Sequence, residues 1–122
     1  AVDDERDTLE LVRVILERAG AVVTTATDAA AALDALRRTR PDVLLTDIGM
    51  PVEDGYHLLR RVRALGADEG GQTPAIALTA YAGDADRSRT LAAGFQLHLP
   101  KPVDAAQLVA VIANLAGTGE RV

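Results

Sequence analysis

Three aspartates stand at or next to the ends of apolar stretches. Asp3 and Asp4 follow the first two residues of the chain, and Asp47 closes the apolar stretch at 44–47. If the fold brings these carboxylates together they repel one another, so the cluster either raises a carboxyl pKa or binds a cation. The ligands on offer are all oxygens, which favours Mg²⁺, with Mn²⁺ or Ca²⁺ as substitutes.

A threonine and a lysine complete the set of residues that could do chemistry. Thr79 ends the apolar stretch at 75–79, and Lys101 follows the stretch at 95–99. An ammonium group beside a metal-bound carboxylate neutralises the charge of a transferred phosphoryl group, and a hydroxyl donates a hydrogen bond to it. A carboxylate can itself be the nucleophile. The residue types therefore predict a site at which an aspartate accepts a phosphoryl group.

Alternating strand-like and helix-like segments carry these residues. Apolar or β-branched stretches are typical of strands, and the segments between them repeat apolar residues at helical spacing. We expect strands at 21–26, 42–47, 75–79 and 95–99, and helices at 5–19, 28–39, 55–65, 84–93 and 104–116. Short connections between strand and helix favour a parallel sheet with helices on both faces, and ligands bind such sheets at the carboxyl ends of the strands.

Particular residues sharpen three of these elements. The helical spacing predicts that Ala19 ends the buried face of the first helix, and that Asp28 caps the second. Apolar residues alternate with polar ones at 95–99, which predicts one buried face made of Phe95, Leu97 and Leu99. Only Ala1 and Val2 precede the acidic pair, so we expect that this chain begins late and that further apolar residues complete the first strand.

Composition bounds the class of protein. A chain of 122 residues with 48% hydrophobic residues fits one globular domain, and 2% aromatic residues leave the core to Leu, Val, Ile and Ala. The absence of cysteine excludes disulfides and thiolate metal sites. No apolar run approaches the roughly 20 residues of a membrane span and no signal peptide is present, so we expect a cytoplasmic protein without a direct membrane partner. The net charge of -5 argues against direct binding of nucleic acid.

The segments VDDE, TDIGMPVEDG, ALTAYA and LPKPV resemble, in order and spacing, the receiver domain of bacterial two-component response regulators. The resemblance extends from Val2 to about Ala116, which implies a domain at 1–116 and a flexible tail at 117–122. It also implies a flavodoxin-like, doubly wound α/β fold whose five-stranded parallel sheet has the order 2-1-3-4-5.

The same resemblance implies a role for each site residue. Asp47 would accept a phosphoryl group from a histidine kinase or a phosphotransfer domain. Asp3, Asp4, Asp47 and the carbonyl of Gly49 would hold Mg²⁺, with Asp4 as a direct ligand and Asp3 acting through water. As an isolated domain the protein would be no enzyme beyond its own phosphorylation and dephosphorylation.

Four further residues surround the expected phosphate in this family. Thr79 and Lys101 would contact the phosphate, and the Lys101–Pro102 peptide bond would be cis. His98 stands where the family often has a switch Tyr or Phe, although a histidine on an edge strand without a switching role is an equal alternative. Tyr81 stands at a position that tunes the rate of dephosphorylation.

The predicted helix at 104–116 has no charged residue after Asp104. A surface helix this apolar often marks an interface, so we expect a docking or dimer face formed with the segments at 84–93 and 95–99. An alanine-rich helix that serves only helical propensity is the alternative. The arginine clusters at 37–40 and 60–63 are interpreted as solvated helix faces.

The expected function is that of a phosphorylation-dependent signalling switch. The second half of the chain most resembles receivers fused to hybrid sensor histidine kinases, and a stand-alone response regulator is the close alternative. A phosphatase of the haloacid dehalogenase type would need a second acid two residues after its nucleophile, where this chain has Gly49. A receiver-like module that is never phosphorylated is disfavoured by the complete set of acids, threonine and lysine.

Overall fold

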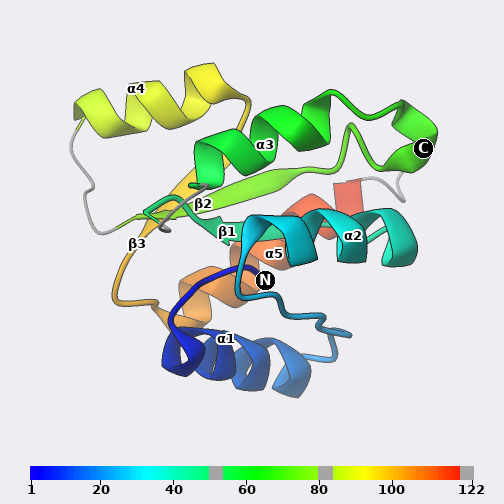
Figure 1. Ribbon diagram of the computed structural model, residues 1–122. Coiled ribbons are helices and arrows are strands. Elements are labelled where there is room, and N and C mark those ends of the chain that lie inside the picture. Colours follow the sequence, from blue (N-terminus) through cyan, green and yellow to red (C-terminus); the bar gives the residue numbers. More distant parts are fainter. Residues whose placement is uncertain (50–53, 80–83, 119–122) are drawn as a thin grey trace.

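The computed structural model describes residues 1–49, 54–79 and 84–118 (Figure 1). From residue 29 onward, helices and strands alternate along the chain as expected. Their bounds are α1 (Arg6–Arg18), α2 (Ala29–Thr39), β1 (Leu44–Asp47), α3 (Gly55–Arg63), the short 3₁₀ helix η1 (Ala67–Glu69), β2 (Ala75–Thr79), α4 (Asp84–Ala93), β3 (Leu97–Pro100) and α5 (Ala105–Thr118). In the described part of the chain, none of these helices is both long and apolar enough to cross a membrane.

The sheet is parallel and has the order β1-β2-β3. On the side of β1 that faces away from β2, Val2 forms isolated parallel bridges with both Thr46 and Ala26. The succession across the sheet is therefore Ala26, Val2, β1, β2 and β3, which confirms the predicted order. The described residues form three strands. Of the expected first strand only Val2 pairs, through two isolated bridges, and of the strand predicted at 21–26 only Ala26 pairs, through one of them.

The prediction of a strand at 21–26 is wrong for all of that segment except the bridge at Ala26. A β-branched segment forms a ladder only against a neighbouring strand, and here its neighbour consists of Ala1 and Val2. Beyond the hydrogen bonds of Ala26, the ammonium group of Ala1 donates to the carbonyl of Thr24 over 2.9 Å. Val22 is left 99% exposed.

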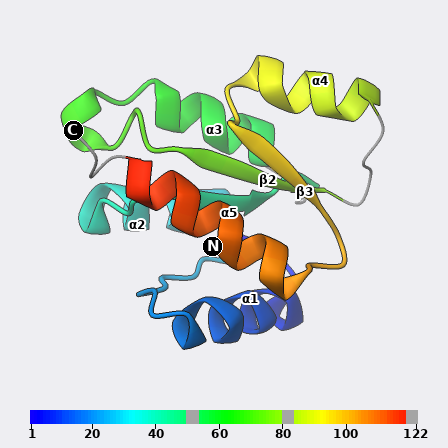
Figure 2. The same ribbon diagram turned by 180° about the vertical axis from the view of Figure 1, so that it is seen from behind.

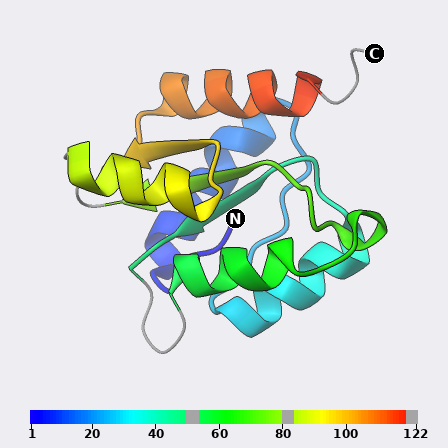
Figure 3. The same cartoon turned by 90° about the horizontal axis from the view of Figure 1, so that it is seen from above.

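Side chains that alternate along the strands divide the core into two layers. Leu45, Ile76 and Leu78 pack on one face of the sheet with Val12 and Leu108, from α1 and α5. The other face carries Leu44, Ala75 and Ala77 together with apolar side chains of α2 and α3. Figures 2 and 3 show α1 and α5 on one side of the sheet and α2, α3 and α4 on the other. Both faces are covered, as a continuous apolar strand requires.

Helix ends follow local capping rules. Asp28 accepts a hydrogen bond from the backbone N–H of Ala31 over 2.8 Å, which confirms its role as the cap of α2. The first helix stops at Arg18, so Ala19 is exposed and its predicted place on the buried face is wrong. The fifth helix continues to Thr118, two residues beyond its predicted end.

The prediction that Phe95, Leu97 and Leu99 share one buried face is wrong for Leu97. Phe95 is 2% exposed but precedes β3, and its ring meets that of Tyr56 edge-on at 6.1 Å. Within the strand Leu99 is buried, whereas Leu97 is 36% exposed. Among the described strands β3 pairs only with β2, so its open edge lets the Leu97 side chain reach solvent.

Arg63 is not part of a solvated helix face. Its guanidinium donates to the carbonyls of Thr73 at 2.7 Å and Gly71 at 3.1 Å, and to that of Gly94 at 3.2 Å. One side chain of α3 thus holds the loop before β2 and the turn between α4 and β3. Burial lowers the pKa of Arg63, which nevertheless keeps its charge at neutral pH.

Candidate phosphoacceptor site

The first strand places Asp47 at the carboxyl edge of the sheet. Leu44 and Leu45 are 4% and 2% exposed, so the strand that carries the carboxylate is fixed in the core. The N–H of Asp47 donates to the carbonyl of Val2 over 2.9 Å, and Asp47 itself is 7% exposed. A carboxylate with so little solvent needs partners, and the next residues supply them.

Residues 1–3 lie between Ala26 and β1, and this places the acidic pair at the same edge of the sheet as Asp47. Val2 donates to the carbonyl of Leu45 over 2.8 Å, and Asp3 donates to that of Ala26 over 3.2 Å. One carboxylate oxygen from each member of the acidic cluster lies within 4.8 Å of the other two, and the three members are Asp3, Asp4 and Asp47. Asp3 is buried and Asp4 is exposed, so one side of the cluster is open to a ligand.

Lys101 supplies the countercharge. Its Nζ lies 2.9 Å from Oδ2 of Asp3 and 3.4 Å from Oδ1 of Asp47. A third carboxylate, that of Glu5, lies 3.5 Å away. The lysine backbone is held as well, because its N–H donates to the carbonyl of Thr79 over 2.8 Å. The Lys101–Pro102 peptide bond is cis.

Burial and charge act on the pKa of both central groups. Burial raises the pKa of Asp47, and the nearby charge of Asp3 adds to this, while hydrogen bonds from Gly49 and Lys101 offset part of it. For Lys101 burial acts to lower the pKa, but its hydrogen bond to Asp3 and the charges of Asp47 and Asp3 outweigh burial and raise it. The lysine is therefore a permanent cation beside a carboxylate that ionises reluctantly.

Thr79 and Gly49 complete the immediate surroundings. Thr79 ends β2 with 2% exposure, one position beyond the pairing of Asp47 with Leu78. The N–H of Gly49 donates to Oδ1 of Asp47 over 3.2 Å, which fixes the rotamer of the carboxylate. The structure thus brings the predicted acids, threonine, lysine and glycine to one edge of the sheet.

Two predicted site residues stand apart. His98 is partly buried in β3, opposite Ala77, and no hydrogen bond or ion pair within the described ranges joins it to the acidic cluster. Tyr81 lies outside the described residues. For His98 both interpretations, a switch residue and an edge histidine without such a role, stay open.

Two functional residues were missed. A Cβ on Gly55 would stand 2.7 Å from the carbonyl oxygen of Asp47 and 2.8 Å from Cα of Ile48, so only glycine lets α3 begin this close to the backbone of Asp47. The dipeptide Asp-Gly before a helical segment was the available signal. Glu5 was missed because its position in the sequence is that of an ordinary acid before the first turn of a helix.

A doubly wound parallel sheet with an acidic cluster and a lysine at its carboxyl edge defines the receiver class of signalling domain. The family model described as the response regulator receiver domain matches residues 1–113. The chain therefore belongs to the receiver domain family of two-component signalling. Receiver domains are signalling modules rather than classical enzymes, and they interact with histidine kinases or phosphotransfer proteins.

Three similar proteins illustrate the range of this family. An uncharacterized 14.6 kDa protein of Leptolyngbya boryana is 47% identical over 91% of this chain and 83% of its own length. Hybrid signal transduction histidine kinase D of Dictyostelium discoideum is 36% identical over 88% of this chain, which spans only 7% of that kinase.

One similar protein of known structure contains a metal ion. The receiver domain of sensor histidine kinase PA1611 from Pseudomonas aeruginosa, described with a magnesium ion coordinated in the active site cleft, is 34% identical. The two superpose with a TM-score of 0.84 over 95% of this chain and 93% of the other.

Proposed function

We propose that Asp47 accepts a phosphoryl group from the phosphohistidine of a histidine kinase or phosphotransfer domain. The P–N bond of the donor breaks, a P–O bond forms to a carboxylate oxygen of Asp47, and the histidine leaves with the electron pair. The observation that carries this proposal is the Lys101 ammonium 3.4 Å from Oδ1 of Asp47, with three acids grouped beside it.

The donor set suits Mg²⁺, because three carboxylate oxygens within 4.8 Å form a hard, all-oxygen site. Asp3, Asp4 and Asp47 would hold the ion together with the carbonyl of Gly49, and Mn²⁺ or Ca²⁺ would substitute. When bound, the cation supplies positive charge opposite the phosphoryl oxygens. Asp4, the exposed member, would be the direct ligand, and Asp3, engaged with Lys101, would act through water.

Thr79 and Lys101 then respond to the phosphoryl group. Lys101 would exchange its contact with Asp47 for a phosphate oxygen, and the hydroxyl of Thr79 would donate to another. Because the Lys101 backbone is tied to the Thr79 carbonyl, the ends of β2 and β3 move together. Tyr81 would limit access to the phosphate, and His98 would report the change at the edge of the sheet.

Intact mass after incubation with Mg²⁺ and a small-molecule phosphodonor tests the proposal. One phosphoryl adduct is expected on the natural chain and none on Asp47→Asn. The matched control is Asp42→Asn, which removes an exposed aspartate from the far end of the same segment and should leave the adduct unchanged. Absence of an adduct on the natural chain, or an equal adduct on Asp47→Asn, would overturn the proposal.

We further propose that this switch domain, residues 1–116, works in the cytoplasm as part of a hybrid histidine kinase. The likeness to the Dictyostelium and Pseudomonas kinases supports this setting. The Leptolyngbya protein, most of whose length this chain spans, favours the stand-alone alternative. The gene sequence on both sides of these codons decides between them, since a hybrid kinase encodes a transmitter domain in the same reading frame.

The face formed by α4, β3 and α5 is proposed as the signalling and dimer surface (Figure 3). Leu91 is 47% exposed and Leu97 36%, and α5 presents Ala106 and Ala110 to solvent. Light scattering of Leu91→Glu, with Leu11→Glu on α1 as a control of similar exposure, tests it. Loss of dimer in the first variant alone is expected. A natural chain that stays monomeric with and without phosphodonor would contradict the dimer.

The phosphatase alternative lacks its second acid. Position 49, two residues after the nucleophile, is an exposed glycine whose N–H only supports Asp47. In a binding module that is never phosphorylated, the contacts of Lys101 with the carboxylates would have no functional role. Neither alternative has an observation in its favour.

A further inference from the structure

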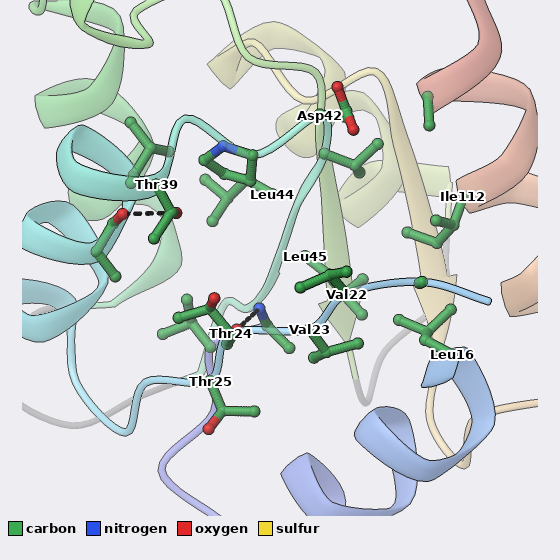
Figure 4. A pocket seen from close by; sticks show the side chains of 18 of the residues that line it. Leu16, Val22, Val23, Thr24, Thr25, Thr39, Asp42, Leu44, Leu45 and Ile112 are labelled. Atoms are coloured by element: carbon green, nitrogen blue, oxygen red, sulfur yellow. Dashed lines mark hydrogen bonds between the residues drawn. The ribbon is translucent and has the colours of Figure 1, made fainter. Parts of the chain in front are cut away.

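Strand β1 is packed unequally along its length. Beside Leu45 a cavity of about 610 Å³ lies between the strand and residues 21–26 (Figure 4). At the end that carries Asp47, the backbone is instead in close contact with α3. The N–H of Gly55 donates to the carbonyl of Ile48 over 3.3 Å, and a Cβ added to Gly55 would overlap the carbonyl oxygen of Asp47. A change in the backbone at Asp47 therefore displaces the start of α3, because closely packed atoms transmit strain.

Tyr56 connects the start of α3 to α4. Its side chain is buried, and its ring lies nearly perpendicular to that of Phe95, with the centroids 6.1 Å apart. The guanidinium carbon of Arg89, from α4, lies over the same ring at 4.3 Å from its centroid. Figure 1 shows α4 beside α3 on the same face of the sheet. Two successive residues of α3 thus contact the backbone of Asp47 and the side chain of Arg89.

The two attachments of α4 to α3 differ in strength. Arg89 is exposed, and a cation over an aromatic ring at such a position changes an equilibrium by a factor of about two to five. At the other end of α4, Arg63 donates to the carbonyl of Gly94 over 3.2 Å, and hydrogen bonds from a charged donor are stronger. The helix can therefore move at its Arg89 end while the turn at Gly94 stays held.

We propose that the Arg89–Tyr56 contact holds α4 in its resting position and is released when Asp47 is phosphorylated. This inference rests on the proposed function. The phosphoryl group alters the turn at 47–49, the start of α3 moves with that turn, and the ring of Tyr56 leaves the guanidinium of Arg89. The change reaches the proposed signalling face through α3, in addition to the hydrogen bond between the ends of β2 and β3. Arg89 is a positioning residue that does not touch the phosphoryl group.

Coupling between two sites is reciprocal, which fixes the sign of the expected effect. A contact that stabilises the resting position of α4 opposes the binding of a phosphoryl group at Asp47 by the same factor. Removing the cation of Arg89 should therefore tighten that binding. The loss of a positive charge would by itself weaken the binding of an anion, so tighter binding cannot result from the change in charge.

Two measurements on the variant Arg89→Gln test the proposal. The first is the dissociation constant of beryllium fluoride, a tetrahedral analogue of the phosphoryl group, in the presence of Mg²⁺. The second is hydrogen exchange, without any ligand, at the amide of Phe95, whose N–H donates to the carbonyl of Thr90 in α4. The matched control is Arg60→Gln, which makes the same change of charge at an exposed arginine of α3. Arg89→Lys keeps a cation at the ring.

Arg89→Gln should lower the dissociation constant about two- to fivefold and speed exchange at Phe95 by a similar factor. Arg60→Gln should stay within about 1.5-fold of the natural chain in both measurements, because a distant exposed charge is screened. Arg89→Lys should lie closer to the natural chain than Arg89→Gln does. In a chain that already carries Tyr56→Leu, Arg89→Gln should change neither quantity, since the ring is gone.

Unchanged or weaker binding by Arg89→Gln, or unchanged exchange at Phe95, would overturn the proposal. An Arg89→Lys chain that behaves like Arg89→Gln would also overturn it, and this comparison leaves the core unaltered. Failure of beryllium fluoride to bind any of the chains, the natural one included, would refute the phosphoacceptor role of Asp47 and this inference with it. Binding with equal dissociation constants to the natural chain and to Arg89→Gln would refute only the role of Arg89.

Discussion

Asp47 is a carboxylate that the folded protein holds at an energetic cost. Its raised pKa means that burial and the neighbouring acid outweigh the help from Lys101 and Gly49. The proposed phosphoacceptor role gains from this arrangement, because a carboxylate that is poorly solvated is closer in energy to the acyl phosphate it would form. Removing the charge of Asp47 should therefore increase the stability of the folded protein.

Asp47→Asn should therefore raise the thermal midpoint by roughly 3 °C at pH 7 without divalent cations. The unfolded state ionises near the ordinary aspartate value of 3.8 and the folded state at a higher pH, so stability falls across that interval and stays lower above it. The advantage of the variant should shrink as the pH falls toward 3.8. Thermal melts from pH 7 to pH 4 in EDTA measure this, and a midpoint below that of the natural chain at pH 7 would contradict it.

The residues of the site were predictable to different degrees. Asp47 and Thr79 end apolar stretches, and strand ends of a parallel sheet converge, so their meeting followed from the sequence. Glu5 and Gly55 could not be found this way. The role of Glu5 depends on where the Lys101 side chain lies, and that of Gly55 on a 2.7 Å approach between two backbones.

At the scale of elements, Arg63 holds together parts of the chain that pack weakly on their own. Its three acceptor carbonyls belong to the loop after η1 and to the turn after α4. Among its described residues, α4 buries Thr90 and packs Ala93 against the core, and Arg89 lies over the ring of Tyr56 at 4.3 Å. Arg63 adds a further anchor at the turn that follows α4, through the carbonyl of Gly94.

Arg63→Ala should lower the free energy of unfolding by about 2 kcal/mol, because three carbonyls lose a charged donor. Arg60→Ala, which removes an exposed arginine from the same helix, should change it by less than about 0.5 kcal/mol. Urea denaturation of the two variants measures the difference. Equal effects would show that Arg63 acts only as a surface charge.

A helix or strand was predictable where its own side chains determine its structure. It was not predictable where a neighbouring strand determines whether it forms. The helices followed from apolar spacing and, for α2, from the Asp28 cap. Strand β2 was predicted to the residue because it is buried along its whole length. The segment at 21–26 has equal β propensity, but a strand exists only with its partner, and one bridge at Ala26 is all that Val2 provides.

At the scale of the whole molecule, a chain that begins at Ala1 carries a largely buried ammonium group at that residue. Burial lowers the pKa of the Ala1 ammonium from 8.0 to about 6. The folded state therefore loses this proton at a lower pH than the unfolded state does. Stability is reduced below pH 6, where both states carry the charge, and is restored as the pH rises toward 8.

The free energy of unfolding should accordingly rise by about 2 kcal/mol between pH 6 and pH 8. The control is the same chain acetylated at Ala1, which lacks the amine and keeps every side chain. Urea denaturation in EDTA compares the two. A rise of equal size in the acetylated chain would show that the amine is not its cause.

The contact between Lys101 and Asp3 joins residues 98 positions apart. Closing so long a loop costs conformational entropy that only a formed sheet offsets, so this contact belongs to the last stage of folding. During synthesis on the ribosome, Asp3 therefore emerges 98 residues before Lys101. A nascent chain that has not yet reached Lys101 holds the acidic cluster but not its countercharge, so the candidate site is completed only when the last strand of the sheet has been made.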